Sequence, residues 1–140
     1  MKFFAQMIIA FVILIGIRET SLSDDPGIIN TTYSLEAFLS LPPSMQENRC
    51  KNAAHVVGLL QNGSWRKSCE LPSAQVFSHC VFGRHLSQTW ECYCYLTASC
   101  REENNRSLKL NEKKRIDNCK RDDIANCKGR LKCRDKGKGC

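Results

Sequence analysis

Ten cysteines constrain the fold of this chain more than any other feature of its sequence. They lie between residues 50 and 140, at Cys50, Cys69, Cys80, Cys92, Cys94, Cys100, Cys119, Cys127, Cys133 and Cys140. An even number of cysteines in an exported protein indicates a disulfide framework, because the secretory pathway oxidises thiols. We therefore expect up to five disulfides and no free thiol, and the sequence leaves their pairing open.

The N-terminus predicts this export. Lys2 precedes a nearly continuous apolar run over residues 3–17, which has the length of a signal-peptide core and is too short to span a bilayer. We expect cleavage after Ser23, with Gly16 as the alternative site. Residues 1–23 are thus predicted to be the signal peptide of a secreted, extracellular protein with no transmembrane segment after cleavage; an uncleaved anchor is the alternative. Three sequons, which also fit the secretory route, predict N-glycosylation of exposed loops at Asn30, Asn62 and Asn105.

The remainder divides into two parts. Residues 24–49 contain no cysteine and carry Pro26, Pro42 and Pro43, so we expect a loosely attached leader. Residues 50–140 form the predicted cysteine-rich domain. Its apolar core alone would be marginal at this size, so disulfides worth about 2–4 kcal/mol each are expected to be structural in the first place.

One helix is predicted near the start of the domain. Ser44 and Glu47 have the spacing of a capping box, and Asn62-Gly63 supplies residue types that end helices in the left-handed conformation. Between them apolar residues follow at spacings of three, four and three: Cys50, Ala53, Val57 and Leu60. We expect this helix to end near Gln61, with a shorter helix before it over residues 35–41.

The middle of the chain predicts strands. Residues 75–82 and 89–96 are rich in aromatic and β-branched side chains and are expected to pair as a hairpin or small sheet. In a strand Cys92 and Cys94 share a face, so they should bond to different elements, with the flanking helices as the expected targets.

After Cys100 the chain becomes polar and charged. Over residues 107–126 and the cysteine that follows them, four residues have roughly helical spacing: Leu108, Ile116, Cys119 and Cys127. Residues 130–140 are predicted to be a loop pinned at Cys133 and Cys140. The predicted fold class is therefore a small disulfide-rich α+β domain with an N-terminal helix, short antiparallel strands, and a C-terminal basic helix and loop.

Metal and catalytic motifs are weak. No Cys-x2-Cys pair occurs, so we expect no metal site and no cofactor. Glu70 and Glu91 are too far apart in sequence to argue a glycosidase pair. Three histidines are the remaining candidates for acid–base chemistry in a small secreted nuclease: His55, His79 and His85. We expect no catalytic residues and no enzymatic activity.

Positive charge is concentrated at the C-terminus. Residues 24–100 sum to −1, whereas residues 101–140 hold fourteen Lys or Arg against seven Asp or Glu. After Cys127, cations occupy every second position: Lys128, Arg130, Lys132, Arg134, Lys136 and Lys138. These six residues are the predicted binding site for a polyanion or an acidic partner surface, with a solvated surface as the equal alternative. Over residues 109–121 acids are interleaved, and a solvated surface is favoured.

The overall organisation resembles the broad class of secreted cysteine-rich effectors of venoms and saliva, although no single motif carries this resemblance. We predict a secreted, non-enzymatic, toxin-like binding protein that acts on an extracellular receptor or ion channel. Heparan sulfate and anionic membrane surfaces are further candidate partners, and export argues against nucleic acid. The alternatives are an endogenous matrix-bound cytokine-like or growth-factor-like ligand, and a small secreted hydrolase or nuclease.

Overall fold

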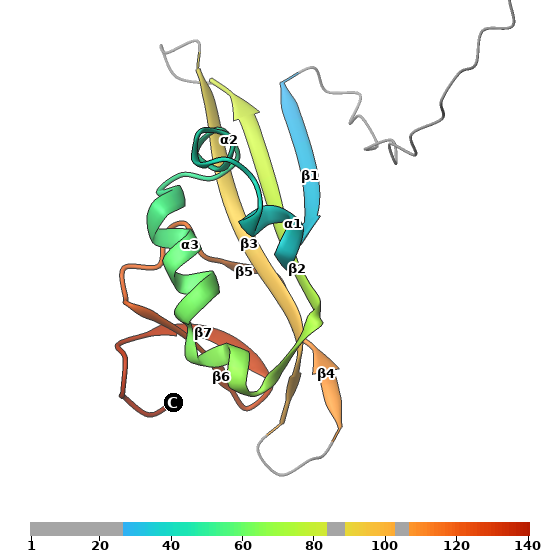
Figure 1. Cartoon of the computed structure of the whole chain (residues 1–140), viewed down its shortest axis with the longest axis vertical. Helices are drawn as coiled ribbons and strands as arrows, with labels where there is room; N and C mark the ends of the chain where they lie inside the picture. Colours follow the sequence, from blue (N-terminus) through green and yellow to red (C-terminus); the bar gives the residue numbers. More distant parts are fainter. Residues whose placement is uncertain (1–26, 84–88, 103–106) are drawn as a thin grey trace, which may run out of the picture.

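The computed structural model of the chain describes residues 27–83, 89–102 and 107–140. Within them, a five-stranded antiparallel sheet is accompanied by three helices, one 3-10 turn and a separate two-stranded hairpin (Figure 1). The elements in chain order are β1 (Ile28–Ser34), α1 (Leu35–Leu39), α2 (Pro43–Arg49), α3 (Ala53–Asn62), η1 (Ser64–Lys67), β2 (Cys69–Phe82), β3 (Trp90–Arg101), β4 (Leu108–Leu110), β5 (Lys114–Arg115), β6 (Asp123–Cys127) and β7 (Arg130–Arg134). The disulfide-rich α+β class is confirmed. The predicted signal peptide, Asn105 and His85 lie outside the described residues.

The long β2–β3 hairpin is the centre of the sheet. Its ladder pairs Val76 with Leu96 and Cys80 with Cys92, which confirms the predicted pairing of residues 75–82 with 89–96. Cys92 and Cys94 both face the buried side, as expected from their spacing. β1 and β4 flank this pair, and β5 also pairs with β3.

The expectation of a loosely attached leader is wrong for residues 28–49. β1 pairs with β2 over seven residue pairs, from Ile28↔Val81 to Ser34↔Gln75. Leu35 and Phe38 of α1 are buried in the core, and the hydroxyl of Ser34 accepts the Ala37 N–H at the start of that helix. Absence of cysteine and presence of proline therefore did not indicate weak attachment, because one edge strand and two apolar side chains anchor the segment.

The predicted long helix is two helices. α2 begins with Pro43 after Pro42, so Ser44 is inside the helix rather than its cap. The helical conformation is interrupted at residues 50–52. Asn52 adopts a left-handed φ of 57°, and Cys50 is extended and disulfide-bonded to Cys94 of β3. α3 ends at Asn62, one residue from the expected end. Its buried residues are Ala53, Val56, Leu59 and Leu60.

The prediction of a C-terminal helix is wrong, because residues 107–126, all of which the structure describes, form no helix. These residues contribute β4, β5 and β6 instead, and β6 pairs with β7 across a two-residue turn. Lys128 and Gly129 in this turn have φ of 56° and 81°, the combination of a type I′ hairpin turn. The predicted loop over 130–140 is thus a strand in its first half.

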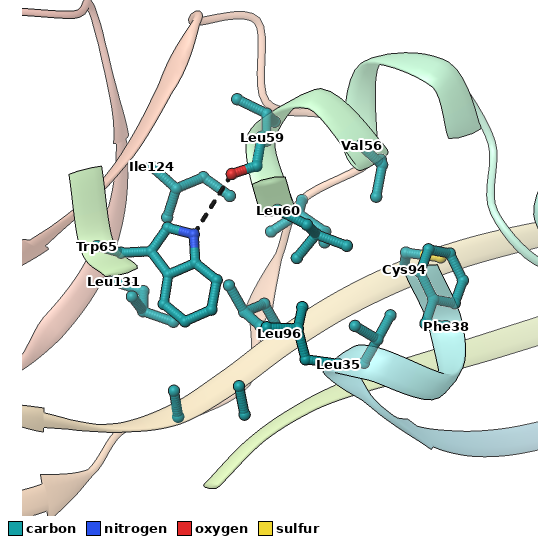
Figure 2. Close-up of a cluster of buried hydrophobic side chains, with 14 of the residues drawn as sticks. Leu35, Phe38, Val56, Leu59, Leu60, Trp65, Cys94, Leu96, Ile124 and Leu131 are labelled. Atoms are coloured by element: carbon teal, nitrogen blue, oxygen red, sulfur yellow. Dashed lines mark hydrogen bonds between the residues drawn. The ribbon is translucent and has the colours of Figure 1, made fainter. Parts of the chain in front are cut away.

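The core lies between the sheet, the helices and the β6–β7 hairpin. Trp65 of η1 is fully buried at their junction, and its indole N–H donates to the Leu59 carbonyl at 3.3 Å. Figure 2 shows the indole beside Ile124 and Leu131 of the hairpin and near Leu96 of β3. Among the described residues no helix has the length and apolar character needed to cross a bilayer.

All ten cysteines are paired, and the expectation that Cys92 and Cys94 bond to different elements is confirmed. Only Cys94 reaches the helical segment, whereas Cys92 bonds to the neighbouring strand β2. The five disulfides are Cys50–Cys94, Cys69–Cys100, Cys80–Cys92, Cys119–Cys133 and Cys127–Cys140. Three of them lie within residues 50–100 and two within residues 119–140. No disulfide joins these two parts.

This segregation predicts the result of disulfide mapping. Mass spectrometry of peptides from the non-reduced, alkylated protein should give the five pairs above and no alkylated cysteine. A peptide that links a cysteine of residues 50–100 to one of residues 119–140 would contradict the fold.

Gly63 generates a second prediction. Its φ is −62°, so the left-handed conformation expected there is not adopted; glycine is needed for space instead. A Cβ would lie 2.5 Å from both the Leu59 carbonyl oxygen and Cδ1 of Trp65. Gly63→Ala should therefore lower the free energy of unfolding by about 1–3 kcal/mol, measured by urea unfolding.

Gly58 in α3 provides the matched control. A Cβ there meets nothing within 4 Å, and alanine is the better helix former, so Gly58→Ala should raise the free energy of unfolding by about 0.5–1 kcal/mol. Equal effects of the two substitutions would show that crowding at Gly63 has no energetic weight.

Candidate polyanion-binding cleft

Two segments that are distant in sequence line one basic cleft of about 450 Å³. One side is the β4–β5 segment and the other is the β6–β7 hairpin. Among the described residues, the lining of this basic cleft includes six cations and two carboxylates: Lys109, Lys113, Lys114, Lys128, Arg130, Lys132, Glu102 and Glu112. Lys109 and Glu102 form an ion pair at 3.7 Å. The remaining excess of positive charge favours an anionic ligand.

Hydrogen bonds of Asn126 position the hairpin side of the cleft. Its side-chain oxygen accepts the Gly129 N–H at 2.8 Å within the turn, and its Nδ2 donates to the Arg101 carbonyl at the end of β3, also at 2.8 Å. Gly129 passes close to Glu102, because a Cβ at this position would lie 3.0 Å from the Glu102 Cγ. The turn is therefore fixed against the sheet by both a polar bond and a close backbone approach.

Asn111 positions the opposite side. Its side chain is buried, its backbone carbonyl accepts the Thr97 hydroxyl at 2.7 Å, and its Nδ2 donates to the Ala98 carbonyl. These bonds tie the connection between β4 and β5 to strand β3. Lys114 is then paired with Leu96 in the sheet, which sets the direction in which its side chain extends.

The structure divides the six cations predicted from the sequence. Lys128, Arg130 and Lys132 line the basic cleft. Arg134 instead donates from Nε to Asp123 at 3.1 Å and from Nη2 to the Ser64 hydroxyl at 3.1 Å. Lys138 pairs with Asp135 at 2.8 Å. Lys136 is exposed and is not among the residues that line the cleft.

Sequence reasoning missed the other half of the cleft. Lys109, Lys113 and Lys114 were interpreted as part of a solvated surface, and no local pattern distinguishes them from other exposed lysines. Their position depends on the pairing of β4 and β5 with β3. The turn signal Lys128-Gly129, with glycine at the second position of a two-residue hairpin, could have identified the hairpin side of the cleft as strands, but it carries no information about these lysines.

Asp123 is the buried charge that holds the hairpin in place. Oδ1 accepts the Ser64 N–H and Oδ2 accepts the Ser64 hydroxyl, both at 2.7 Å, and Arg134 adds an ion pair. Burial by itself would raise the pKa of Asp123, but the bonds from Ser64 and Arg134 outweigh it and lower the pKa. The ionised carboxylate is thus the stabilised form.

A second, exposed ion pair organises the chain end. The hydrogen bonds from Lys138 and then Arg121 lower the pKa of Asp135, and the bond to Asp135 raises the pKa of Lys138. Because these groups are exposed, water and salt screen their interaction and its effect on stability is small.

Among the described residues, neither the two candidate glutamates nor the two histidines are brought together. In the β2–β3 ladder Glu70 pairs with Ser99 and Glu91 with Val81, so the two glutamates lie roughly 30 Å apart at a rise of 3.3 Å per residue. His55 Nε2 lies 2.8 Å from the Cys119 carbonyl, whereas His79 Nδ1 bonds to Asn30. Within the described residues no group of three potential metal ligands is found.

No family model, no curated protein and no solved structure matches this chain significantly. The five disulfides nevertheless make it a small cysteine-rich protein of the extracellular type.

The Asp123 carboxylate gives a pH prediction. Because its pKa is lower in the folded protein than its ordinary value of 3.8, the ionised group stabilises the fold above that pH, and this contribution is lost as the pH falls through the folded pKa. Asp123→Asn should lower the free energy of unfolding by about 3 kcal/mol at pH 7, and the difference from the parent should shrink as the pH falls below 3.8. Urea unfolding over this pH range measures both.

The matched control is Asp122→Asn, which makes the same change in charge at the adjacent, exposed carboxylate. It should cause a much smaller loss. Parallel pH profiles for Asp123→Asn and the parent protein would show that the carboxylate is not the source of the stabilisation.

Proposed function

We propose that this protein is a non-enzymatic effector of the kind secreted in venom or saliva. Its basic cleft binds an acidic surface on an extracellular receptor or ion channel. The observation that carries the proposal is the convergence of six cations from two separate segments on one cleft of about 450 Å³, against two carboxylates in the part of the chain that the structure describes.

Charge at this density affects both affinity and rate. A concave surface lined by one sign of charge concentrates its field, attracts the oppositely charged partner and accelerates association. A protruding acidic loop can place several carboxylates into such a cleft, and the arginine can bind one of them in bidentate geometry. The cleft therefore favours a partner with clustered negative charge.

The disulfides support binding by reducing its entropic cost. Cys127 lies directly before the turn and is bonded to Cys140, while Cys133 in β7 is bonded to Cys119. These bonds restrict the backbone that carries Arg130 and Lys132. A preorganised surface loses less conformational freedom on binding than a flexible basic tail would lose.

A non-enzymatic role is supported by the positions of the acidic and histidine side chains. Glu70 and Glu91 belong to opposite ends of one ladder, and His55 and His79 each have a separate partner. A matrix-bound ligand remains the second candidate, because the sulfates of heparan sulfate present the same charge to the same cleft.

Heparin provides a defined polyanion to test the cleft. The parent protein should elute from a heparin column well above about 0.15 M salt, where exposed charges are already screened beyond ~8 Å. The triple variant Lys114→Gln, Arg130→Gln and Lys132→Gln should elute at markedly lower salt.

The control removes three exposed lysines that do not line the cleft: Lys51→Gln, Lys67→Gln and Lys120→Gln. Its net charge equals that of the cleft variant, so its elution should stay near that of the parent. An equal shift in both variants would indicate nonspecific attraction by net charge and contradict the cleft.

The same variants distinguish the candidate functions on cells. Binding of the parent that survives heparinase treatment but is lost in the cleft variant supports a protein receptor or channel, whereas binding lost on heparinase treatment supports a matrix-bound ligand. Degradation of RNA by the parent, abolished by His79→Ala, would replace both with a nuclease.

A further inference from the structure

The sheet has a second surface, opposite the buried core, that the proposed function does not use. Alternate residues of the ladder place Asn30, His79 and Tyr93 in one row and Thr32, Phe77 and Tyr95 in the next. We call this surface the outer face. Figure 1 shows the helices on the other side of the sheet.

A shallow cavity of about 500 Å³ lies on the outer face. Its floor includes the half-buried aromatic side chains of Phe77 and Tyr95, and Asn30, Thr32 and His79 lie around them. The ammonium group of Lys113 lies 3.8 Å from the centroid of the Phe77 ring. The cavity thus combines apolar ring faces with hydrogen-bond donors, the composition typical of small-ligand sites.

Asn30 belongs both to this cavity and to the sequon Asn30-Thr31-Thr32. It is exposed on β1, an edge strand of the sheet. Its side-chain oxygen accepts a hydrogen bond from His79 Nδ1 at 2.6 Å. This bond fixes the amide and directs Nδ2, the atom that carries the sugar in an N-linked glycoprotein, away from His79.

We propose that Asn30 carries an N-linked glycan whose first sugars pack into the cavity on the outer face. A lipid-pyrophosphate-linked oligosaccharide is the donor: the bond from its sugar C1 to the pyrophosphate oxygen breaks, a bond from C1 to Asn30 Nδ2 forms, and Nδ2 loses one proton. The apolar faces of the sugars then contact Phe77 and Tyr95, and Lys113 donates to their hydroxyl groups.

The sequon at Asn62 lacks these features. Asn62 is exposed at the end of α3 and does not line the cavity. A glycan on Asn62 would extend into solvent, so it serves as an internal comparison. Lys113 lines both this cavity and the basic cleft, but the three cations replaced in the heparin test, Lys114, Arg130 and Lys132, do not line the cavity, so the two proposals can be tested separately.

The test uses the full chain secreted from eukaryotic cells. Thr32→Ala destroys the sequon but leaves Asn30 and His79 unchanged, and Thr32→Ser keeps the sequon. Glycopeptide mass spectrometry should find Asn30 occupied in the parent and in Thr32→Ser, and unoccupied in Thr32→Ala. An unoccupied Asn30 in the secreted parent would overturn the proposal.

Packing of the sugars requires its own readout. Loss of the glycan in Thr32→Ala should lower Tm by about 4 °C relative to Thr32→Ser, but should have no further effect when Phe77 is already replaced by alanine. Loss of the Asn62 glycan through Asn62→Gln should leave Tm nearly unchanged. Equal Tm values for Thr32→Ala and Thr32→Ser would overturn the packing of the sugars against the sheet. Heparin elution of Thr32→Ala should be unchanged, so a failure of this proposal can be distinguished from a failure of the proposed function.

Discussion

The buried carboxylate of Asp123 is the contact on which the placement of the basic hairpin depends. Because no disulfide links residues 50–100 to residues 119–140, side-chain interactions must hold the two parts together. Asp123 receives two hydrogen bonds from Ser64 and one ion pair from Arg134, next to the apolar contact of Trp65 with the hairpin. A buried ion pair of this kind gives little net stability, yet removing one partner is costly. Its main effect is therefore to specify one position of the hairpin.

This arrangement assigns different roles to cations that look equivalent in the sequence. Along β7 the exposed side chains of Arg130 and Lys132 line the cleft, whereas Arg134, the next residue in the same alternation, is committed to Asp123. The ion pair of Arg134 with Asp123 thus fixes β7, and this in turn positions Arg130 and Lys132 in the cleft. Of the six cations that follow Cys127, only Lys128, Arg130 and Lys132 line the cleft. These three are held in place by the hairpin and are joined by lysines of the β4–β5 segment.

The sequence predicted those helices and strands in which apolar residues recur at a regular spacing, because this spacing shows which side chains are buried. Residues 75–82 alternate between faces over enough positions to show a strand, and the apolar stripe of α3 is long enough to show a helix. Residues 107–127 contain strands of only two to five residues, so four apolar positions matched a helix by coincidence, and one of them, Leu108, is exposed. The cleft was only half predicted, because its second half is created by strand pairing that no local pattern encodes.

The short strand β5 connects the two surfaces that the proposals concern. Lys114 pairs with Leu96 and lines the cleft, whereas Arg115 pairs with Tyr95 and stacks 4.2 Å from the Tyr93 ring centroid on the outer face. A slip of one residue would exchange the two side chains between the faces. Asp117 prevents this slip, because its carboxylate binds Arg115 at 2.9 Å and accepts the Cys94 N–H at 3.0 Å. One buried aspartate therefore fixes the register of β5, as another fixes the hairpin, and the disulfides secure the segments that these carboxylates align.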